Sequence, residues 1–189
     1  PIYTNNSVVC SGDPEQFTII VNPSAQVNAV SSHNAVLCDG EFTPVYTFTT
    51  ANTDGLTTFA WANDNVGIGL PSSGAGGIPS FAVSNTTQST VFATITVTPS
   101  YENNGIVCEV STETFTILVN PLPKMDALQD LVLCNNETTS IIEFLTSNSD
   151  GNTTYSWVND NTSFGLPSSG NGDLPAFTAN NLSTVTSTA

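Results

Sequence analysis

A stretch of thirty residues recurs in this chain after 96 positions. Residues 52–81 and 148–177 are identical at 18 of 30 positions, and both contain W-x-N-D-N and G-L-P-S-S-G-x-G. A second pair of segments, 1–23 and 99–121, is identical at 13 of 23 positions. Self-similarity at a fixed period indicates a repeat architecture, so fold and function must be argued for an array of units.

The spacing of the four cysteines gives the size of the unit. Cys10 and Cys108 occupy matching positions 98 residues apart, and Cys38 and Cys134 occupy matching positions 96 residues apart. A unit of about 97 residues is too long for a solenoid repeat and is close to the size of an immunoglobulin-like sandwich. Each unit is therefore expected to be a domain with its own core.

The tripeptide V-N-P marks the ends of successive units, at residues 21–23 and 119–121. Proline ends a strand there because it has no backbone N–H to donate to a neighbouring strand. The sequence therefore predicts the C-terminal strands of one repeat (1–23), a complete β-sandwich repeat (24–121) and the N-terminal part of the following repeat (122–189).

Two interpretations of this 189-residue sequence remain open. It is either an excerpt of a longer array or a two-repeat building block of a filament. In the second case Phe17–Val21 of one copy would dock on residues 122–189 of its neighbour, because open sheet edges recruit strands. Partners would then be neighbouring repeats or copies of the chain itself.

Alternating residues predict an all-β fold. Aliphatic residues alternate with threonines in Ala93–Thr98, and Phe115–Val119 is similar, as expected for strands with one face in the core. Asn103-Asn104-Gly105 between these runs predicts a hairpin turn. Two further strands are expected at Tyr46 with Phe48 and at Phe59 with Trp61. We expect an antiparallel sandwich in which Trp61, and Trp157 in the next unit, are core anchors.

The net charge of −15, with one basic residue against 16 acidic ones, restricts the partners. Nucleic acid is excluded because binding requires cations to displace phosphate counterions. No apolar run approaches the ~20 residues of a membrane span, so we expect no direct membrane insertion of this segment. One pair of cysteines per unit is typical of an oxidising, extracellular setting.

The order of motifs along the unit resembles the PKD-like repeats of giant Bacteroidota surface proteins, of which the gliding-motility adhesin of flavobacteria is one. The matching segments cover the whole window in register: Cys38, Trp61–Asn65, Gly69–Gly76, Ile78–Phe81, Ala93–Pro99 and Phe115–Pro121. The resemblance implies an immunoglobulin-like sandwich, export by the type IX secretion route and a role in adhesion.

The cysteines suggest a disulfide. Because each complete unit owns one cysteine of each kind, we expect Cys38 to bond Cys108, with Cys10 and Cys134 finding partners outside the window. Closing a loop of ~70 residues would contribute about 4 kcal/mol. The alternative is pairing between neighbouring repeats, which applies if the two positions lie at opposite ends of the sandwich.

Acidic turns are candidates for a calcium site, because calcium prefers carboxylate and carbonyl oxygens. The candidates are Asp54 and Asp64, with Asp150 and Asp160 at the matching positions of the next unit. The competing interpretation is that these residues cap turns through their own backbones. We expect no other cofactor.

We expect no enzymatic activity, because the single histidine, His33, has no counterpart in the next unit and no Ser–His–Asp set can recur. The sequence favours a non-enzymatic stalk of a secreted cell-surface adhesin or filament. Two alternatives remain. One is a glycan-binding module in which Tyr3 and Tyr101 stack on sugars, and the other is a set of spacer domains in a large secreted enzyme.

Overall fold

The computed structural model describes residues 1–109 and 111–188, and its regular elements are almost all strands. No helix in these residues is long and apolar enough to cross a membrane. The elements are β1 (Ile2–Asn5), β2 (Val8–Ser11), η1 (Ser31–His33), β3 (Ala35–Cys38), β4 (Leu56–Asn63), η2 (Val66–Ile68), β5 (Ser73–Ala75), β6 (Val91–Asn103), β7 (Ile106–Glu109), β8 (Glu113–Asn120), β9 (Ser156–Val158), η3 (Thr162–Phe164) and β10 (Ser169–Asn171).

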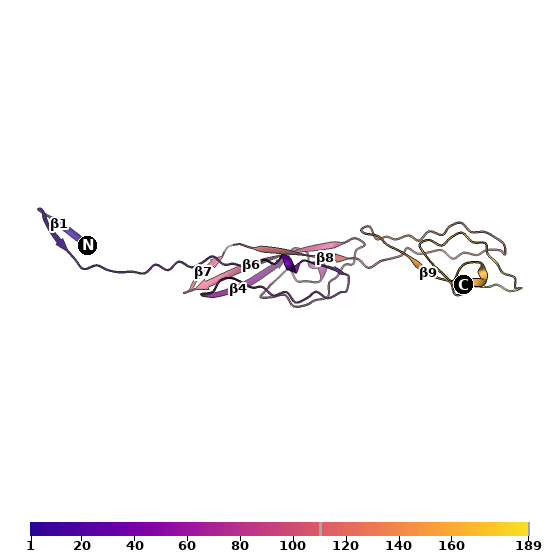
Figure 1. Ribbon diagram of the computed structural model, residues 1–189, viewed down its shortest axis with the longest axis horizontal. Coiled ribbons are helices and arrows are strands. Elements are labelled where there is room, and N and C mark those ends of the chain that lie inside the picture. Colours follow the sequence, from indigo (N-terminus) through magenta and orange to yellow (C-terminus); the bar gives the residue numbers. More distant parts are fainter. Residues whose placement is uncertain (110, 189) are drawn as a thin grey trace.

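The expected all-β class is confirmed, and Figure 1 shows the chain as an elongated series of three parts. The hairpin β1–β2 lies at one end and is joined by an extended segment to a central body that contains β3 to β8. A third body with β9 and β10 follows along the same long axis. The three parts lie in sequence order.

One mixed sheet of six strands forms the central body, in the order β3-β8-β6-β4-β5 with β7 also paired to β6. The 13-residue β6 is the spine of the sheet, because β4 lies on one side of it and β7 and β8 follow each other on the other side. The predicted hairpin turn at Asn103–Gly105 is confirmed, since Asn103 pairs with Ile106 and Asn104 has φ 51°.

The expectation of a purely antiparallel sheet needs correction, because β3 runs parallel to β8 with Cys38 beside Asn120. The strand expected at Tyr46 and Phe48 is also not regular. Tyr46 makes only an isolated bridge to Ile78. Pro44 and Pro79 lie in the two facing segments, and neither can donate to a ladder.

These facing segments form the second layer over the sheet. Thr43 holds them together, since its N–H donates to the Phe81 carbonyl at 3.0 Å and its Oγ1 accepts from the Phe81 N–H at 3.2 Å. The enclosed core is drawn entirely from residues within 24–121. Its buried members are Val30, Tyr46, Trp61, Ile68, Leu70, Ile78, Val83, Ala93, Ile95, Val97, Phe115, Ile117 and Val119.

Trp61 lies in this core with 7% of its surface exposed. Its indole lies flat on β5, because Trp61 pairs with Gly74 and a Cβ on Gly74 would come within 2.2 Å of Cζ2. The glycine-rich run G-L-P-S-S-G-x-G therefore contains a short strand. Trp157 pairs with Gly170 in the same way, but is half-buried.

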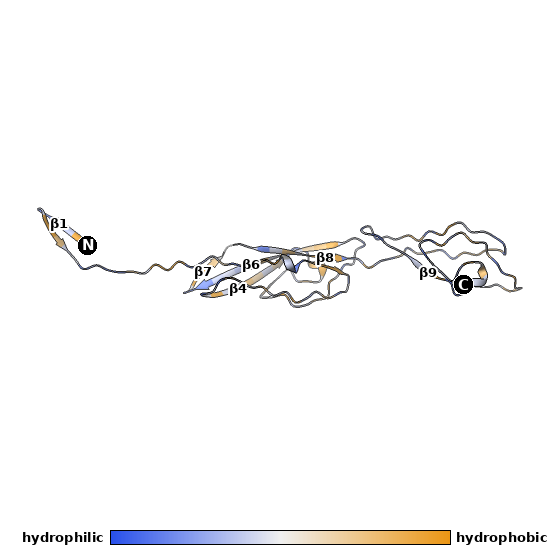
Figure 2. Cartoon of the chain, in the orientation of Figure 1, coloured by the Kyte–Doolittle hydropathy of each residue, from blue (hydrophilic) through white to orange (hydrophobic). Residues whose placement is uncertain are grey.

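The hairpin β1–β2 and the segment after it, up to Val21, are exposed along their whole length. Figure 2 shows hydrophobic residues along this stretch, and Phe17, Ile19 and Val21 are 85%, 74% and 85% exposed. Their counterparts in the complete unit lie in β8, where all three are buried. Among the described residues, this sequence pattern is therefore buried in a core only in the central body.

Candidate functional site: the junctions between units

The place where the chain enters each unit is fixed by an asparagine. Asn52 donates from Nδ2 to the carbonyl of Ser24 at 3.0 Å, and its Oδ1 accepts from the N–H of Gln26 at 2.9 Å. Asn148, one period later, makes the same pair of bonds to the chain entering the next unit, at 3.1 and 2.7 Å. An amide that satisfies one carbonyl and one N–H clamps an incoming segment in one orientation.

A second contact joins the end of one unit to the start of the next. Asn22 Nδ2 donates to the Asn103 carbonyl at 3.1 Å, and Asn103 Nδ2 donates to Asn22 Oδ1 at 3.1 Å. Asn22 belongs to the V-N-P tripeptide that ends the preceding unit, and Asn103 lies at the β6–β7 turn of the complete one. We call this end of the complete unit its upstream end.

The opposite, downstream end of the complete unit contacts the segment that follows. The Thr90 N–H donates to Asp150 Oδ2 at 2.9 Å, and the Ser149 N–H donates to the Gln88 carbonyl at 3.0 Å. Thr90 Oγ1 also donates to Asn120 Oδ1 at 2.9 Å, so the last residue of β8 belongs to the same network. Both ends therefore carry polar contacts to a neighbour.

Tyr101 is buried at the upstream end. It is 0% exposed, and its hydroxyl donates to the backbone carbonyl of Asp54. Gly55 is required beneath it, because a Cβ there would lie 2.7 Å from the ring. Burial therefore leaves no ring surface of Tyr101 open to a sugar, which counts against the glycan-binding alternative in the complete unit. Tyr3, the matching residue, is 67% exposed.

The structure separates Cys38 from Cys108 and corrects the expected disulfide. Cys38 lies beside Asn120 at the downstream end, whereas Cys108 pairs with Tyr101 at the upstream end. Measured along the direction of β6, the two cysteines are eleven residues apart, which is about 36 Å at ~3.3 Å per residue. A disulfide requires Cα atoms within ~7 Å of each other. None of the four cysteines is bonded to another within the residues that the structure describes. The expected partners of Cys10 and Cys134 outside this sequence stay a prediction.

The calcium candidates are separated too. Asp54 precedes β4 and Asp64 follows it, so a strand of eight residues lies between them. Asp64 Oδ1 accepts from the Thr94 N–H at 2.7 Å, and Asp150 Oδ2 is the junction acceptor for Thr90. Asp160 lies in the turn that matches Asp64. These carboxylates are not gathered at one point, and the residues described contain no cluster of three metal-ligating side chains.

The W-x-N-D-N motif locks the loop after β4. Asn63 is 7% exposed, donates from Nδ2 to the Leu70 carbonyl at 2.9 Å, and accepts from the Asn65 N–H at 3.0 Å. Asn65 in turn donates to the Phe92 carbonyl at 2.9 Å, which ties the loop to β6. Asn159 repeats the first two bonds in the next unit, at 3.0 and 3.0 Å. Turn chemistry, the competing interpretation, accounts for the motif.

His33 packs among aromatic rings. Its ring centroid lies 5.4 Å from that of Tyr46 and 6.0 Å from that of Phe48, and Nε2 lies 3.1 Å from the Thr47 carbonyl. Burial raises the pKa of Tyr46 above its ordinary value near 10. The histidine therefore contributes a packed aromatic surface at the side of the core.

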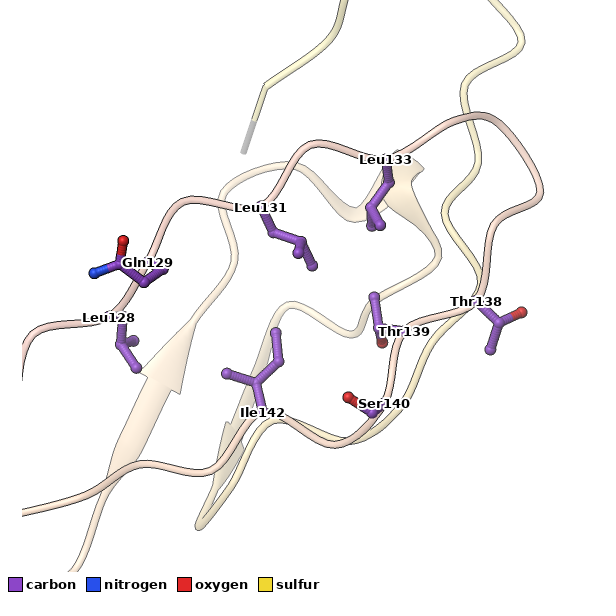
Figure 3. A pocket seen from close by; sticks show the side chains of 8 residues that line it. All are labelled: Leu128, Gln129, Leu131, Leu133, Thr138, Thr139, Ser140 and Ile142. Atoms are coloured by element: carbon purple, nitrogen blue, oxygen red, sulfur yellow. The ribbon is translucent and has the colours of Figure 1, made fainter.

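The following unit has an open apolar cleft of about 370 Å³. Figure 3 shows Leu128, Leu131, Leu133 and Ile142 directed toward the same space. In the complete unit, the matching residues Val30 and Tyr46 are buried in the core to which β6 and β8 contribute, and the matching Leu37 packs against it. The cleft is thus the position that a β6–β8 hairpin would fill.

Comparison with known proteins adds no relative: no family model matches this chain, and neither does any curated protein. Sequence reasoning found the repeat, the tryptophans and the turn residues. It missed the junction roles of Asn22, Asn52 and Asn103, although Asn22 and Asn52 both recur at matching positions, as Asn120 and Asn148.

Proposed function

We propose that this chain is a segment of a tandem array of immunoglobulin-like, PKD-like sandwiches that acts as an extended stalk at the cell surface, in adhesion or in gliding motility. The observation that carries the proposal is that each unit clamps the segment by which the chain enters it, through Asn52 and again through Asn148. A spacer whose units tumbled freely would need no such clamp.

The charge of the chain supports the same function. With 16 acidic residues against one basic residue, successive units repel each other and resist collapse. Repulsion keeps the array extended while the clamp sets its direction. The burial of Tyr101 counts against the glycan-binding alternative in the complete unit.

The stalk mechanism is tested by measuring how length grows with the number of units. Tandem proteins with one, two and three copies of residues 24–121, joined Pro121 to Ser24, are compared by small-angle X-ray scattering. We expect each copy to add a constant increment of about 43 Å, the length of the 13-residue β6 at ~3.3 Å per residue.

The matched control is Asn52→Ala in every copy, which removes the clamp and leaves the core unchanged. We expect smaller increments that decrease with copy number, because the joints become flexible. Increments that decrease in the unmodified series as well would contradict a rigid stalk.

The cellular role needs a separate experiment. Monovalent antibody fragments raised against residues 24–121 should label intact source cells and reduce their attachment to, or movement over, a surface. Labelling that required permeabilised cells would exclude a surface role. Labelling without any effect on attachment or movement would favour a spacer.

A further inference from the structure

The two cysteines of a unit lie at its two ends, where the chain contacts its neighbours. The position of Cys38 is set by a tight turn at the downstream end. Its N–H donates to Glu41 Oε2 at 2.8 Å, and its carbonyl accepts from the Glu41 N–H at 3.1 Å. Cys134 makes the same two contacts with Glu137 at 2.8 and 3.0 Å, so the thiol is placed identically in both units.

Cys38 shares a face of the sheet with Asn120. The two residues are directly paired in the parallel strands β3 and β8, and paired residues point to the same side. Alternation in β8 fixes which side this is, because Val119 is buried in the core and Asn120 is therefore directed away from it.

Cys108 shares a face with Asn103 at the other end of the unit. Cys108 is directly paired with Tyr101, and Asn103 lies two residues further along β6. Since side chains alternate along a strand, all three project to one side of the hairpin. Cys108 is half-buried there, whereas Cys38 is exposed.

The junction brings these two faces together. Asn22 is the counterpart of Asn120 in the preceding unit, and it makes the two 3.1 Å hydrogen bonds with Asn103 described above. The face that bears Asn120 and Cys38 in one unit is therefore the face that meets Asn103 and Cys108 of the next. Cys38 lies one strand from Asn120, about 5 Å across the sheet. Cys108 lies one strand and two residues from Asn103, about 7–8 Å on the diagonal.

We propose that Cys38 of each unit forms a disulfide with the counterpart of Cys108 in the unit that follows, so that the array is stapled across every junction. In this chain Cys38 would bond the second cysteine of the unit that begins at residue 122. Cys108 would bond the first cysteine of the unit to which residues 1–23 belong. The inference rests on the proposed tandem array.

Formation of the bond is a two-electron oxidation. The two thiols lose two protons and two electrons, an S–S bond forms, and an oxidant of the disulfide class is reduced to two thiols. In the test, oxidised glutathione is that oxidant. A disulfide between domains closes no loop within a unit. Its effect is to hold adjacent units together under mechanical load.

The test uses two copies of residues 24–121 joined Pro121 to Ser24, which recreates the Pro23–Ser24 junction with Asn120 in the place of Asn22. Three variants keep two cysteines each and carry serine at the other two positions. The junction variant keeps Cys38 of the first copy and Cys108 of the second. The outer variant keeps Cys108 of the first copy and Cys38 of the second, and the single-unit variant keeps both cysteines of the first copy.

Each variant is incubated with a glutathione redox buffer, and free thiols and mass are then measured on the monomer. We expect the junction variant to lose both thiols and the mass of two hydrogens, while the other two variants keep both thiols. A junction variant that keeps its thiols, or a single-unit variant that closes, overturns the inference.

Small-angle scattering of the reduced junction variant separates the two proposals. If it is extended but does not oxidise, the disulfide is wrong and the stalk stands. If its two units move independently, the docked junction itself is wrong, and the proposed function fails with it.

Discussion

The complete unit, 24–121, and the segment 122–188 carry the same motifs in different surroundings. The locked turns are alike in both, and β9 pairs with β10 in the register in which β4 pairs with β5. The cores differ. Val30 is 1% exposed in the complete unit, while its counterpart Leu128 is 45% exposed.

The difference teaches what each part of the sequence contributes. Turns and caps form wherever their own few residues are present, because their hydrogen bonds are local. Burial of Trp61 and the eight-residue length of β4 depend on β6, which pairs with all of β4. Without a counterpart of that hairpin, the matching strand β9 is three residues long.

The largest effect is expected from supplying the hairpin. Joining residues 91–121 after residue 186 should give a segment that unfolds cooperatively, with a free energy of about 5–15 kcal/mol, the usual range for a domain. The added strands would cover the cleft at Leu133 and bury Trp157. Urea unfolding followed by tryptophan fluorescence measures both.

The control for this chimera carries Ile117→Asp in the added hairpin, which places a charge in the core. We expect that version to unfold without cooperativity. If residues 122–188 alone already show a cooperative transition and a blue-shifted indole fluorescence, the two regions do not differ in their ability to form a core.

The next largest effect is expected from truncating the core tryptophan. Trp61→Ala in residues 24–121 should lower the free energy of unfolding by about 3–5 kcal/mol, because it removes the largest side chain of a closed core. The matched change Trp157→Ala, in the present chain, should have a much smaller effect. Equal losses at the two sites, measured by urea unfolding, would show that both indoles are equally packed.

Trp61→Phe sharpens the same prediction. The buried indole Nε1 of Trp61 has no hydrogen-bond partner among the described residues, so phenylalanine removes an unsatisfied group and deprives no other group of a partner. We expect this variant to retain most of the stability that alanine loses.

A smaller effect is expected from filling the space beneath the indole. Gly74→Ala should cost about 1–3 kcal/mol by overpacking, because the new Cβ would lie within 2.2 Å of Trp61. In a Trp61→Ala background the same change should cost much less, since neighbouring changes are not additive. Thermal unfolding of the four proteins completes this double-mutant cycle, and simple additivity would contradict the stacking of the indole on β5.

The smallest effect concerns pH. Burial raises the pKa of the Tyr46 hydroxyl, so the unfolded chain loses this proton first, near pH 10. The stability that Tyr46 contributes is therefore complete below about pH 10 and is lost as pH rises toward the folded-state pKa. Tyr46→Phe should reduce the loss of stability between about pH 8 and 11. A variant with an unchanged pH dependence would contradict this assignment.

Much of the local structure could be predicted from sequence, and particular residues show why. Asn103-Asn104-Gly105 predicts a turn because Asn and Gly tolerate positive φ, and Phe115–Val119 predicts a strand because alternate residues are apolar. Tyr46 and Phe48 predicted a strand that is only an isolated bridge, because the prolines of this segment and of its partner interrupt the ladder.

The sequence by itself determined the repeat, its period and the all-β class, because these follow from self-similarity and from the alternation of side chains along a strand. Only the tertiary structure decided where the two cysteines of a unit lie. Sequence separation does not measure distance across a sheet: β6 carries the chain the full length of the unit, so Cys38 and Cys108 lie at opposite ends of it. The same strand places the two thiols at the two ends of the unit that carry the contacts to its neighbours.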